Sequence, residues 1–323
     1  MKKILIYNSG GGLGDAIQLF TLIISLKNHF SKSDFYYIGA HENHYQNKLK
    51  EFNLDLKTVD LDLQYFGFRW WHLFIVKKKI LEKKINKFDL IIDEQSKLRN
   101  TLIVKQIPCI NFFSTTFKFI FCSKKNKYLN NESDLSSNIL SNLKLFLNLE
   151  IKKIDYDLKL LPIKYINEAK RLLPGKNYIG FSVTQGNKYR LKSWPIQNFI
   201  DLAGKHTSSG KNIVFFIEKS EIELINKIKK KLPNAIFPEN NSKLNCPALI
   251  TALSSRLEKA VTIDNGVMHM MALAKIPMVT LFGPTSSKKF SPKMKNVKIL
   301  DSKNLYRTTN ISRITVEDVF SCF

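Results

Sequence analysis

"KKILIYNSGGGLGDAIQLF", residues 2–20, combines a strand, a turn and the start of a helix and so indicates the fold class. Its first six residues form an apolar run typical of a buried first strand, and a glycine-rich turn then leads into a helix. Such a turn usually cradles phosphate, because the N–H groups at a helix start point toward the anion. The stretch therefore predicts the opening of an α/β domain built on a parallel sheet.

Asp15 distinguishes this turn from the familiar phosphate-binding loops. Gly10 and Gly12 fit the first two places of the dinucleotide pattern G-x-G-x-x-G, but Asp15 takes the third, where a carboxylate adds bulk and negative charge. The P-loop pattern fails too, because no Lys-Ser or Lys-Thr pair follows the glycines. Two interpretations of Asp15 stay open. It is either an acidic residue favoured by the positive end of a helix or a general base on a loop that faces a cleft.

Short apolar runs alternate with helical stretches along the whole chain, as in βαβ units. Strands are expected at 2–7, 34–40, 88–95, 178–183, 212–217, 259–263 and 277–283. Helices are expected at 15–30, from Pro195 onward as a first-turn proline, at 220–232 and at 267–275. The chain has 323 residues, enough for two cores. We expect two α/β domains, 1–165 and 166–323, with a central cleft, and we allow the C-terminal segment to pack back on the first domain.

The composition is that of a soluble globular protein, with 44% hydrophobic and 24% charged residues. No apolar run approaches the roughly 18 residues that span a bilayer, and the N-terminal apolar run is too short for a signal peptide, so a cytoplasmic location is expected. The cysteines form no C-x-x-C pair, and HENH at 41–44 is one residue short of the H-E-x-x-H pattern. We therefore expect no metal, no disulfide and no cofactor.

The formal net charge of +24 indicates an acidic partner, such as nucleic acid, anionic lipid or a phosphorylated substrate. The 51 basic residues comprise 44 Lys and 7 Arg. Arg is the residue preferred for bidentate recognition of bases and phosphates, so this ratio argues against nucleic acid.

Residues 66–87, FGFRWWHLFIVKKKILEKKINK, are apolar at the start and rich in lysine at the end. One interpretation is an amphipathic segment that rests on an anionic membrane. The other is a core-facing helix with a solvated basic side.

The most informative stretch of the second half is VTIDNGVMHMMALAKIPMVTLFGPT, residues 261–285. An apolar strand ends at Ile263, Asp264 and Asn265 are suited to cap the next helix, and Gly266 permits a close approach to its N-terminus. This pattern predicts an anion site at the carboxyl edge of a parallel sheet. The alternative is an ordinary strand, cap and helix whose methionines and histidine only fill the core.

Four segments, in the expected order, resemble glycosyltransferase family 9, the heptosyltransferases of lipopolysaccharide core synthesis. They are the glycine-containing loop with its aspartate and helix at 10–27, the strand and glutamine-containing turn at 88–104, the Lys-Trp-Pro segment at 192–203, and the D-T-G-like turn through LFGPT at 264–292. The chain departs from the family in carrying Asn265 where the family usually has threonine.

This resemblance implies a GT-B architecture of two Rossmann-like domains, with the acceptor on the first and the nucleotide sugar on the second. It implies inverting, metal-independent transfer of a heptose-like sugar from an ADP-sugar to an anionic lipopolysaccharide inner-core acceptor. The enzyme would work in the cytoplasm, with peripheral contact at the inner membrane. Asp15 would be the base, with Gly12 and Gly14 in the acceptor-side loop, and Lys192 would meet charge on the departing diphosphate.

The nucleotide-sugar pocket implied by the resemblance draws on several loops of the second domain. Its members are Thr184, Gln185, Glu221, Asp264, Asn265, Gly266 and His269, with Glu221 toward the ribose. Other readings stay open: a family 9 transferase that uses another nucleotide sugar for a different surface glycan, a catalytically silent sugar-nucleotide or glycan-binding protein of this fold and, distantly, a nucleic-acid binder.

Overall fold

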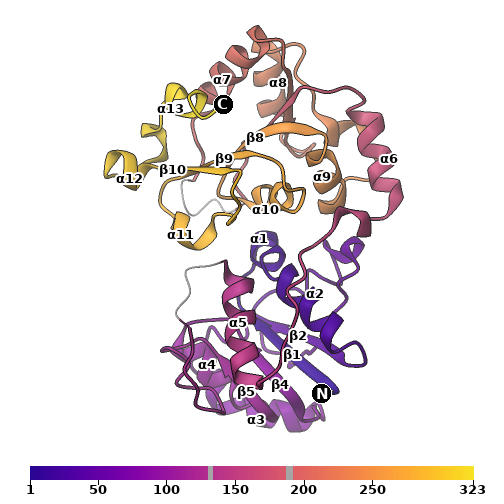
Figure 1. The fold of residues 1–323 in the computed structure, drawn as a ribbon, viewed down its shortest axis with the longest axis vertical. Helices are drawn as coiled ribbons and strands as arrows, with labels where there is room; N and C mark the ends of the chain where they lie inside the picture. The colour runs from indigo at the N-terminus through magenta and orange to yellow at the C-terminus, as the bar shows by residue number, and fades with distance from the viewer. Residues whose placement is uncertain (130–133, 187–191) are drawn as a thin grey trace. The chain divides into compact units, whose positions relative to one another are not determined.

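The computed structural model describes residues 1–129, 134–186 and 192–323. The chain divides into two compact units, Met1–Tyr156 and Asp157–Phe323 (Figure 1). Each unit contains one five-stranded sheet in which all neighbouring strands run parallel. The expected α/β class with two parallel-sheet domains is confirmed.

The first unit has the strand order β3-β2-β1-β4-β5. Its strands are β1 Lys3–Asn8, β2 Asp34–Gly39, β3 Lys57–Thr58, β4 Phe88–Asp93 and β5 Cys109–Ser114. Its helices are α1 Leu13–Ile17, α2 Phe20–His29, η1 Lys50–Phe52, α3 His72–Glu82, α4 Leu98–Val104 and α5 Leu135–Leu147. Helices α3 and α4 pack on the sheet in one apolar cluster, while α2 packs against α5. The central strands β1 and β4 are mostly apolar because both of their faces are covered.

The helix expected over 15–30 is divided into two helices, because side chains from distant segments donate hydrogen bonds to its backbone carbonyls. The Tyr45 hydroxyl donates to the carbonyl of Ala16 at 2.8 Å, and the Ser136 hydroxyl donates to that of Gln18. These bonds replace the regular ladder between α1 and α2. Asp15 therefore lies on a separate short helix.

The segment 66–87 is helical only from His72 to Glu82. Val76 and Ile80 of α3 are buried against the sheet, as the interpretation of this segment as a core-facing helix requires.

The second unit has the strand order β10-β9-β8-β6-β7. Its strands are β6 Tyr178–Ser182, β7 Asn212–Phe216, β8 Leu257–Ile263, β9 Met278–Phe282 and β10 Val297–Asp301. Its helices are η2 Leu158–Leu160, α6 Ile163–Leu172, α7 Ile196–Ser208, α8 Ile222–Lys231, η3 Pro238–Asn241, α9 Pro247–Ser254, α10 Gly266–Leu273, α11 Ser287–Phe290, α12 Ser302–Tyr306, η4 Ile311–Arg313 and α13 Val316–Phe320.

The unit boundary at Tyr156 precedes the one expected at residue 165, because α6 packs on α9 and so belongs to the second unit. The C-terminal segment also stays in its own unit. Helix α13 packs on α7, and the buried Trp194 indole donates to the carbonyl of Ile314 at 2.8 Å. Pro195 is the N-cap of α7 and not a residue of its first turn. Within the part of the chain that the structure describes, no helix combines the length and the apolar character needed to cross a membrane.

Candidate functional site

The strand order locates a candidate site in each unit. In open parallel sheets, ligands bind beyond the carboxyl ends of the strands, where the order of the strands reverses. That point lies between β1 and β4 in the first unit and between β6 and β8 in the second. The first point coincides with the glycine-rich loop before Asp15, and the second with the stretch 261–285.

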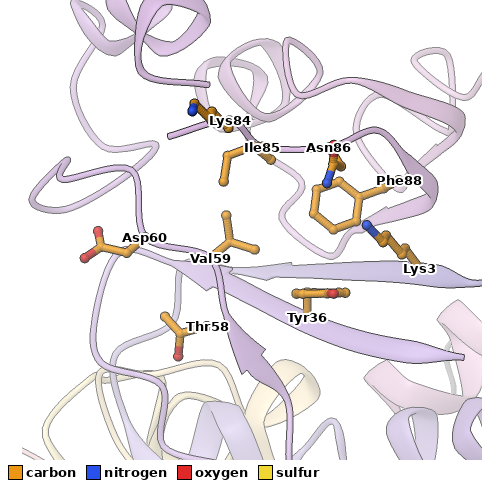
Figure 2. A pocket seen from close by; sticks show the side chains of 9 residues that line it. All are labelled: Lys3, Tyr36, Thr58, Val59, Asp60, Lys84, Ile85, Asn86 and Phe88. Atoms are coloured by element: carbon orange, nitrogen blue, oxygen red, sulfur yellow. The ribbon is translucent and has the colours of Figure 1, made fainter. Parts of the chain in front are cut away.

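A cavity elsewhere in the first unit does not meet this condition (Figure 2). Its lining includes Lys3, the first residue of β1, and Phe88, the first residue of β4. These positions are amino ends of strands, at the edge of the sheet opposite the switch point.

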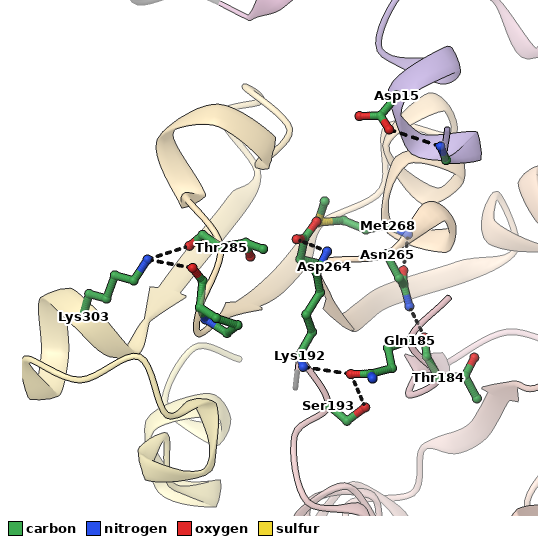
Figure 3. A network of polar contacts seen from close by, with 12 residues as sticks. Asp15, Thr184, Gln185, Lys192, Ser193, Asp264, Asn265, Met268, Thr285 and Lys303 are labelled. Atoms are coloured by element: carbon green, nitrogen blue, oxygen red, sulfur yellow. Dashed lines mark hydrogen bonds and ion pairs between the residues drawn. The ribbon is translucent and has the colours of Figure 1, made fainter. Parts of the chain in front are cut away.

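Asn265 organises the switch point of the second unit. Its Oδ1 accepts from the N–H of Met268 at 3.0 Å, which caps α10 as expected. Its Nδ2 donates to Ser182 Oγ at 2.7 Å and to the carbonyl of Thr184 at 2.8 Å, so both amide hydrogens are engaged (Figure 3). Asn265 therefore fastens α10 to the end of β6. Its side chain has no hydrogen left for a phosphate.

Lys192 and Asp264 form an ion pair beside this cap. Lys192 Nζ lies 2.8 Å from Asp264 Oδ2, with 20% of the lysine side chain and 9% of the aspartate side chain exposed. Asp264 was expected to share the capping of α10, but its carboxylate faces the lysine instead (Figure 3). The ammonium group is thus fixed at the carboxyl edge of the sheet by a single carboxylate oxygen.

Gln185 supports the backbone that carries Lys192. Its Oε1 accepts from the Lys192 N–H at 2.8 Å and from Ser193 Oγ at 3.0 Å. This amide oxygen joins the loop after β6 to the segment before α7. Thr184, next to it, contributes its carbonyl to Asn265.

The other three expected residues of the second unit differ in placement. Gly266 is the first residue of α10 and His269 is buried within that helix. Glu221 is the exposed N-cap residue of α8, beyond β7, and its side chain makes no capping bond. The structure therefore brings Lys192 and Asp264 together with the start of α10, while Glu221 belongs to the neighbouring strand end.

Two features of the second unit gave no clear sequence signal. Glu239 of η3 is 3% exposed, and burial, followed by the nearby Glu218 carboxylate, raises the pKa of Glu239 to about 7. Beyond β9, Lys303 Nζ donates to the carbonyls of Pro284 and Thr285 at 3.0 and 3.2 Å and so closes the LFGPT turn (Figure 3). Neither the burial of Glu239 nor the hydrogen bonds of Lys303 can be predicted from spacing in the sequence.

The glycine-rich loop forms the switch point of the first unit. Asn8 Oδ1 accepts from the N–H of Gly10 at 2.7 Å and from Gln95 Nε2 at 3.2 Å, which ties the loop to the end of β4. Asp15 Oδ2 accepts from the N–H of Gly12, the N-cap of α1, at 3.2 Å. A Cβ on Gly10 would lie 2.5 Å from that of Asp15, so the loop needs glycine there.

One carboxylate oxygen of Asp15 therefore accepts a hydrogen bond at the helix start, as the first interpretation of this residue predicts. That contact leaves its other oxygen, Oδ1, outside the loop's hydrogen bond. Gly14 lies inside α1, one residue before Asp15.

Two acidic residues that end β4 were missed. Asp93 accepts from Thr101 Oγ1 at 2.6 Å and from Ser114 Oγ at 2.7 Å, and burial raises the pKa of Asp93 to about 6. Glu94 is 5% exposed, and its carboxylate oxygens have no hydrogen-bond partner among the described residues. Burial, with Asp93 as the next cause, raises the pKa of Glu94 well above its usual value.

A cationic and aromatic group beside the glycine loop was also missed. Lys97 Nζ and the Arg99 guanidinium lie 5.6 and 5.5 Å from the centre of the Phe68 ring. Phe68 contacts His41, whose ring leaves no room for a Cβ on Gly11. Within the described residues neither cation has an acidic partner. The sequence signal is a run from 95 to 131 without any Asp or Glu.

Among the described residues, no group of three or more His, Cys, Asp or Glu side chains is arranged to hold a metal ion. The chemistry available at the two switch points consists of a carboxylate on a glycine loop, a paired lysine and the start of a helix.

The family model of glycosyltransferase family 9 (heptosyltransferase) matches residues 77–319. A lipooligosaccharide heptosyltransferase 2 of Campylobacter jejuni serotype O:2 is 25% identical over 289 residues, which cover 87% of this chain and 81% of the relative.

Two solved structures share the fold over nearly the whole chain. The glycosyl transferase family 9 protein of Veillonella parvula has a TM-score of 0.68 at 18% identity and covers 99% of this chain and 95% of its own. E. coli heptosyltransferase WaaC with ADP has a TM-score of 0.66 at 14% identity, with 99% and 98% covered. The expected GT-B class is thereby confirmed.

Proposed function

The chain belongs to glycosyltransferase family 9, and from this premise we propose that it transfers a heptose-like sugar from an ADP-sugar to an anionic inner-core acceptor of lipopolysaccharide. The transfer inverts the anomeric centre and needs no metal or other cofactor. The acceptor is anchored in lipid, so the enzyme works at the cytoplasmic face of the inner membrane.

The observation that carries the proposal is the Lys192–Asp264 pair beside the start of α10. When the bond between the anomeric carbon and the diphosphate oxygen breaks, negative charge grows on the leaving diphosphate. The Lys192 ammonium group and the first N–H groups of α10, at Gly266 and Val267, supply positive charge at a switch point. The side chain of Asn265 holds this helix in place and does not contact phosphate.

The first unit supplies the base in this scheme. An acceptor hydroxyl is a poor nucleophile at neutral pH, and a carboxylate that takes its proton in the transition state is worth typically about 10²- to 10⁴-fold in rate. Asp15 carries out this step: the hydroxyl oxygen bonds to the anomeric carbon, the diphosphate leaves with its electron pair, and the proton passes to the carboxylate. Lys97 and Arg99, which have no acidic partner among the described residues, suit an anionic acceptor.

A panel of donors tests this function. Purified protein is incubated with ADP-, UDP- and GDP-sugars, with and without an inner-core acceptor, and the released nucleoside diphosphate is measured in the presence and absence of EDTA. We expect acceptor-dependent release of ADP that EDTA does not abolish, and a product whose anomeric configuration is opposite to that of the donor.

The second candidate is transfer from another nucleotide sugar, which the replacement of the usual threonine by Asn265 favours. Turnover of a UDP- or GDP-sugar in preference to every ADP-sugar would establish it. Absence of turnover with every donor and acceptor would overturn the assignment as an active transferase.

A further inference from the structure

Helix α3 has an outer side that does not match an ordinary solvated surface. His72, Val76 and Ile80 are buried, one turn apart. On the opposite side, Phe74 is 82% exposed and Leu81 is 78% exposed. Burying a large apolar side chain is worth roughly 1.5–3 kcal/mol, so leaving two of them in water on one short helix calls for a partner.

Exposed apolar side chains also occur on two segments outside α3. Trp70 and Trp71, which precede the helix, are 53% and 52% exposed. On the chain after β5, Phe117 and Ile120 are 64% and 73% exposed. The backbone that presents them has positive φ at Phe117, Lys118 and Phe119, a conformation that costs non-glycine residues energy.

These two segments belong to one surface because the end of α4 holds both. Gln106 Nε2 donates to the carbonyl of Leu73 at 2.9 Å, and the adjacent Lys105 Nζ donates to the carbonyl of Phe121 at 3.3 Å. Helices α3 and α4 pack side by side in the same apolar cluster (Figure 1). We use the term docking surface for Trp70, Trp71, Phe74, Phe117 and Ile120.

The charged residues around the docking surface are almost all basic. Glu82 is the single acidic residue from 63 to 87, and none occurs from 95 to 131. Lys77 and Lys78 are exposed on α3, as is Lys118 between the two apolar residues of the second segment. Tryptophan and phenylalanine surrounded by lysines suit the boundary between anionic headgroups and acyl chains, where rings enter the boundary and ammonium groups meet phosphate.

We propose that this docking surface binds the enzyme to an anionic lipid bilayer. The surface contacts the bilayer and does not take part in the chemistry. The inference deepens the proposed function, on which it rests for its purpose, because a lipid-anchored acceptor is met only at a membrane.

Vesicle sedimentation of the full chain tests the proposal. Vesicles of phosphatidylglycerol with phosphatidylethanolamine are compared with vesicles of phosphatidylcholine alone. We expect binding to the anionic vesicles that weakens with added salt, and little binding to the neutral ones.

Two double variants test the residues. Phe74→Ser with Ile120→Ser removes apolar contact, and Lys77→Gln with Lys118→Gln removes charge; each is expected to weaken partition into anionic vesicles by about tenfold or more. The matched control is Ile163→Ser with Ile222→Ser, which replaces residues of the second unit that are 69% and 63% exposed. The control is expected to bind as the wild type does.

Other outcomes would overturn the proposal. Equal binding of both test variants and the wild type is one. If the wild type forms a dimer in size-exclusion chromatography that the test variants lose, and vesicle binding does not change, the surface belongs to an interface with a second copy of the chain. Activity on a water-soluble, lipid-free acceptor is expected to stay unchanged in the test variants, and this separates failure of the docking surface from failure of the proposed function.

Discussion

The ammonium group of Lys192 lies 2.8 Å from a carboxylate oxygen of Asp264, and 72 residues separate the two in the chain. The pair joins the segment before α7 to the end of β8 and is largely shielded from water. A diphosphate that arrives at the start of α10 would compete with Asp264 for this ammonium group. In the proposed mechanism, Asp264 would keep Lys192 in position until the donor binds.

Lys192→Ala is expected to lower kcat by about 10²- to 10³-fold, the usual cost of removing one group that meets charge in the transition state. Steady-state release of nucleoside diphosphate measures the effect. Lys205→Ala is the matched control, because Lys205 also forms a close ion pair, with Glu317 at 2.6 Å, away from the switch point. Equal loss of activity in both variants would show that Lys192 acts only through folding.

Asn265→Ala is expected to lower the free energy of unfolding by about 1–3 kcal/mol, because it removes a helix cap and leaves Ser182 Oγ and the Thr184 carbonyl without their donor. Asn265→Thr retains a capping oxygen and should lose less. Urea unfolding gives the values. Asn310→Ala is the control, because Asn310 caps η4 through the N–H of Ser312 alone. A loss at Asn265 no larger than at Asn310 would contradict a role in fastening α10 to β6.

The sequence predicted the central strands because they are buried on both faces and so read as continuous apolar runs. It missed β3, whose residues are exposed, and β10 and β5, which are only partly covered. It also predicted one helix where there are two. The hydrogen bonds from Tyr45 and Ser136 to the helix carbonyls are tertiary contacts, which local sequence patterns do not predict.

The same limit applies to the site. Motifs located Asn265 as a cap and Lys192 as a candidate cation, but not the pairing of Lys192 with Asp264, which only the fold creates. Glu94 escaped notice because a buried carboxyl without a partner looks in sequence like any surface glutamate. The roles of Asp15, of Lys192 and of the expected nucleotide-sugar-binding residues remain predictions.

Glu239 makes the second unit less stable at higher pH. Its folded-state pKa of about 7 lies above the ordinary value of 4.5, so the folded state holds a proton that the unfolded state releases between those values. The contribution of this carboxyl to stability is then largest below pH 4.5 and is lost as pH rises through 7. Glu239→Gln removes this dependence and should gain up to about 3 kcal/mol relative to wild type between pH 4.5 and pH 8.

Thermal and urea unfolding at several pH values give the difference between variant and wild type, which cancels the titration of Asp93 and Glu94. Glu223→Gln, at an exposed position on α8, is the control. A difference that stays constant from pH 4.5 to pH 8 would show that the carboxyl of Glu239 titrates normally.

Lys97→Ala and Arg99→Ala are each expected to raise the KM for an anionic acceptor by about tenfold, since each removes one cation beside the glycine loop. The KM for the donor should not change. Lys229→Ala removes a cation that lies 5.6 Å from the Phe237 ring in the second unit and serves as the control. A change in the donor KM alone would place the two cations outside the acceptor site.

Asp15→Asn distinguishes a catalytic base from an acidic residue that only stabilises the helix start. Asparagine keeps an oxygen to accept from the N–H of Gly12 and so preserves the structural contact at 3.2 Å, but it does not take a proton from an acceptor hydroxyl. The measurement is the single-turnover rate of sugar transfer by wild type and variant, with donor binding followed by calorimetry. We predict a rate lowered by about 10²- to 10⁴-fold with donor affinity unchanged. A variant that transfers sugar at the wild-type rate would contradict the assignment of Asp15 as the base.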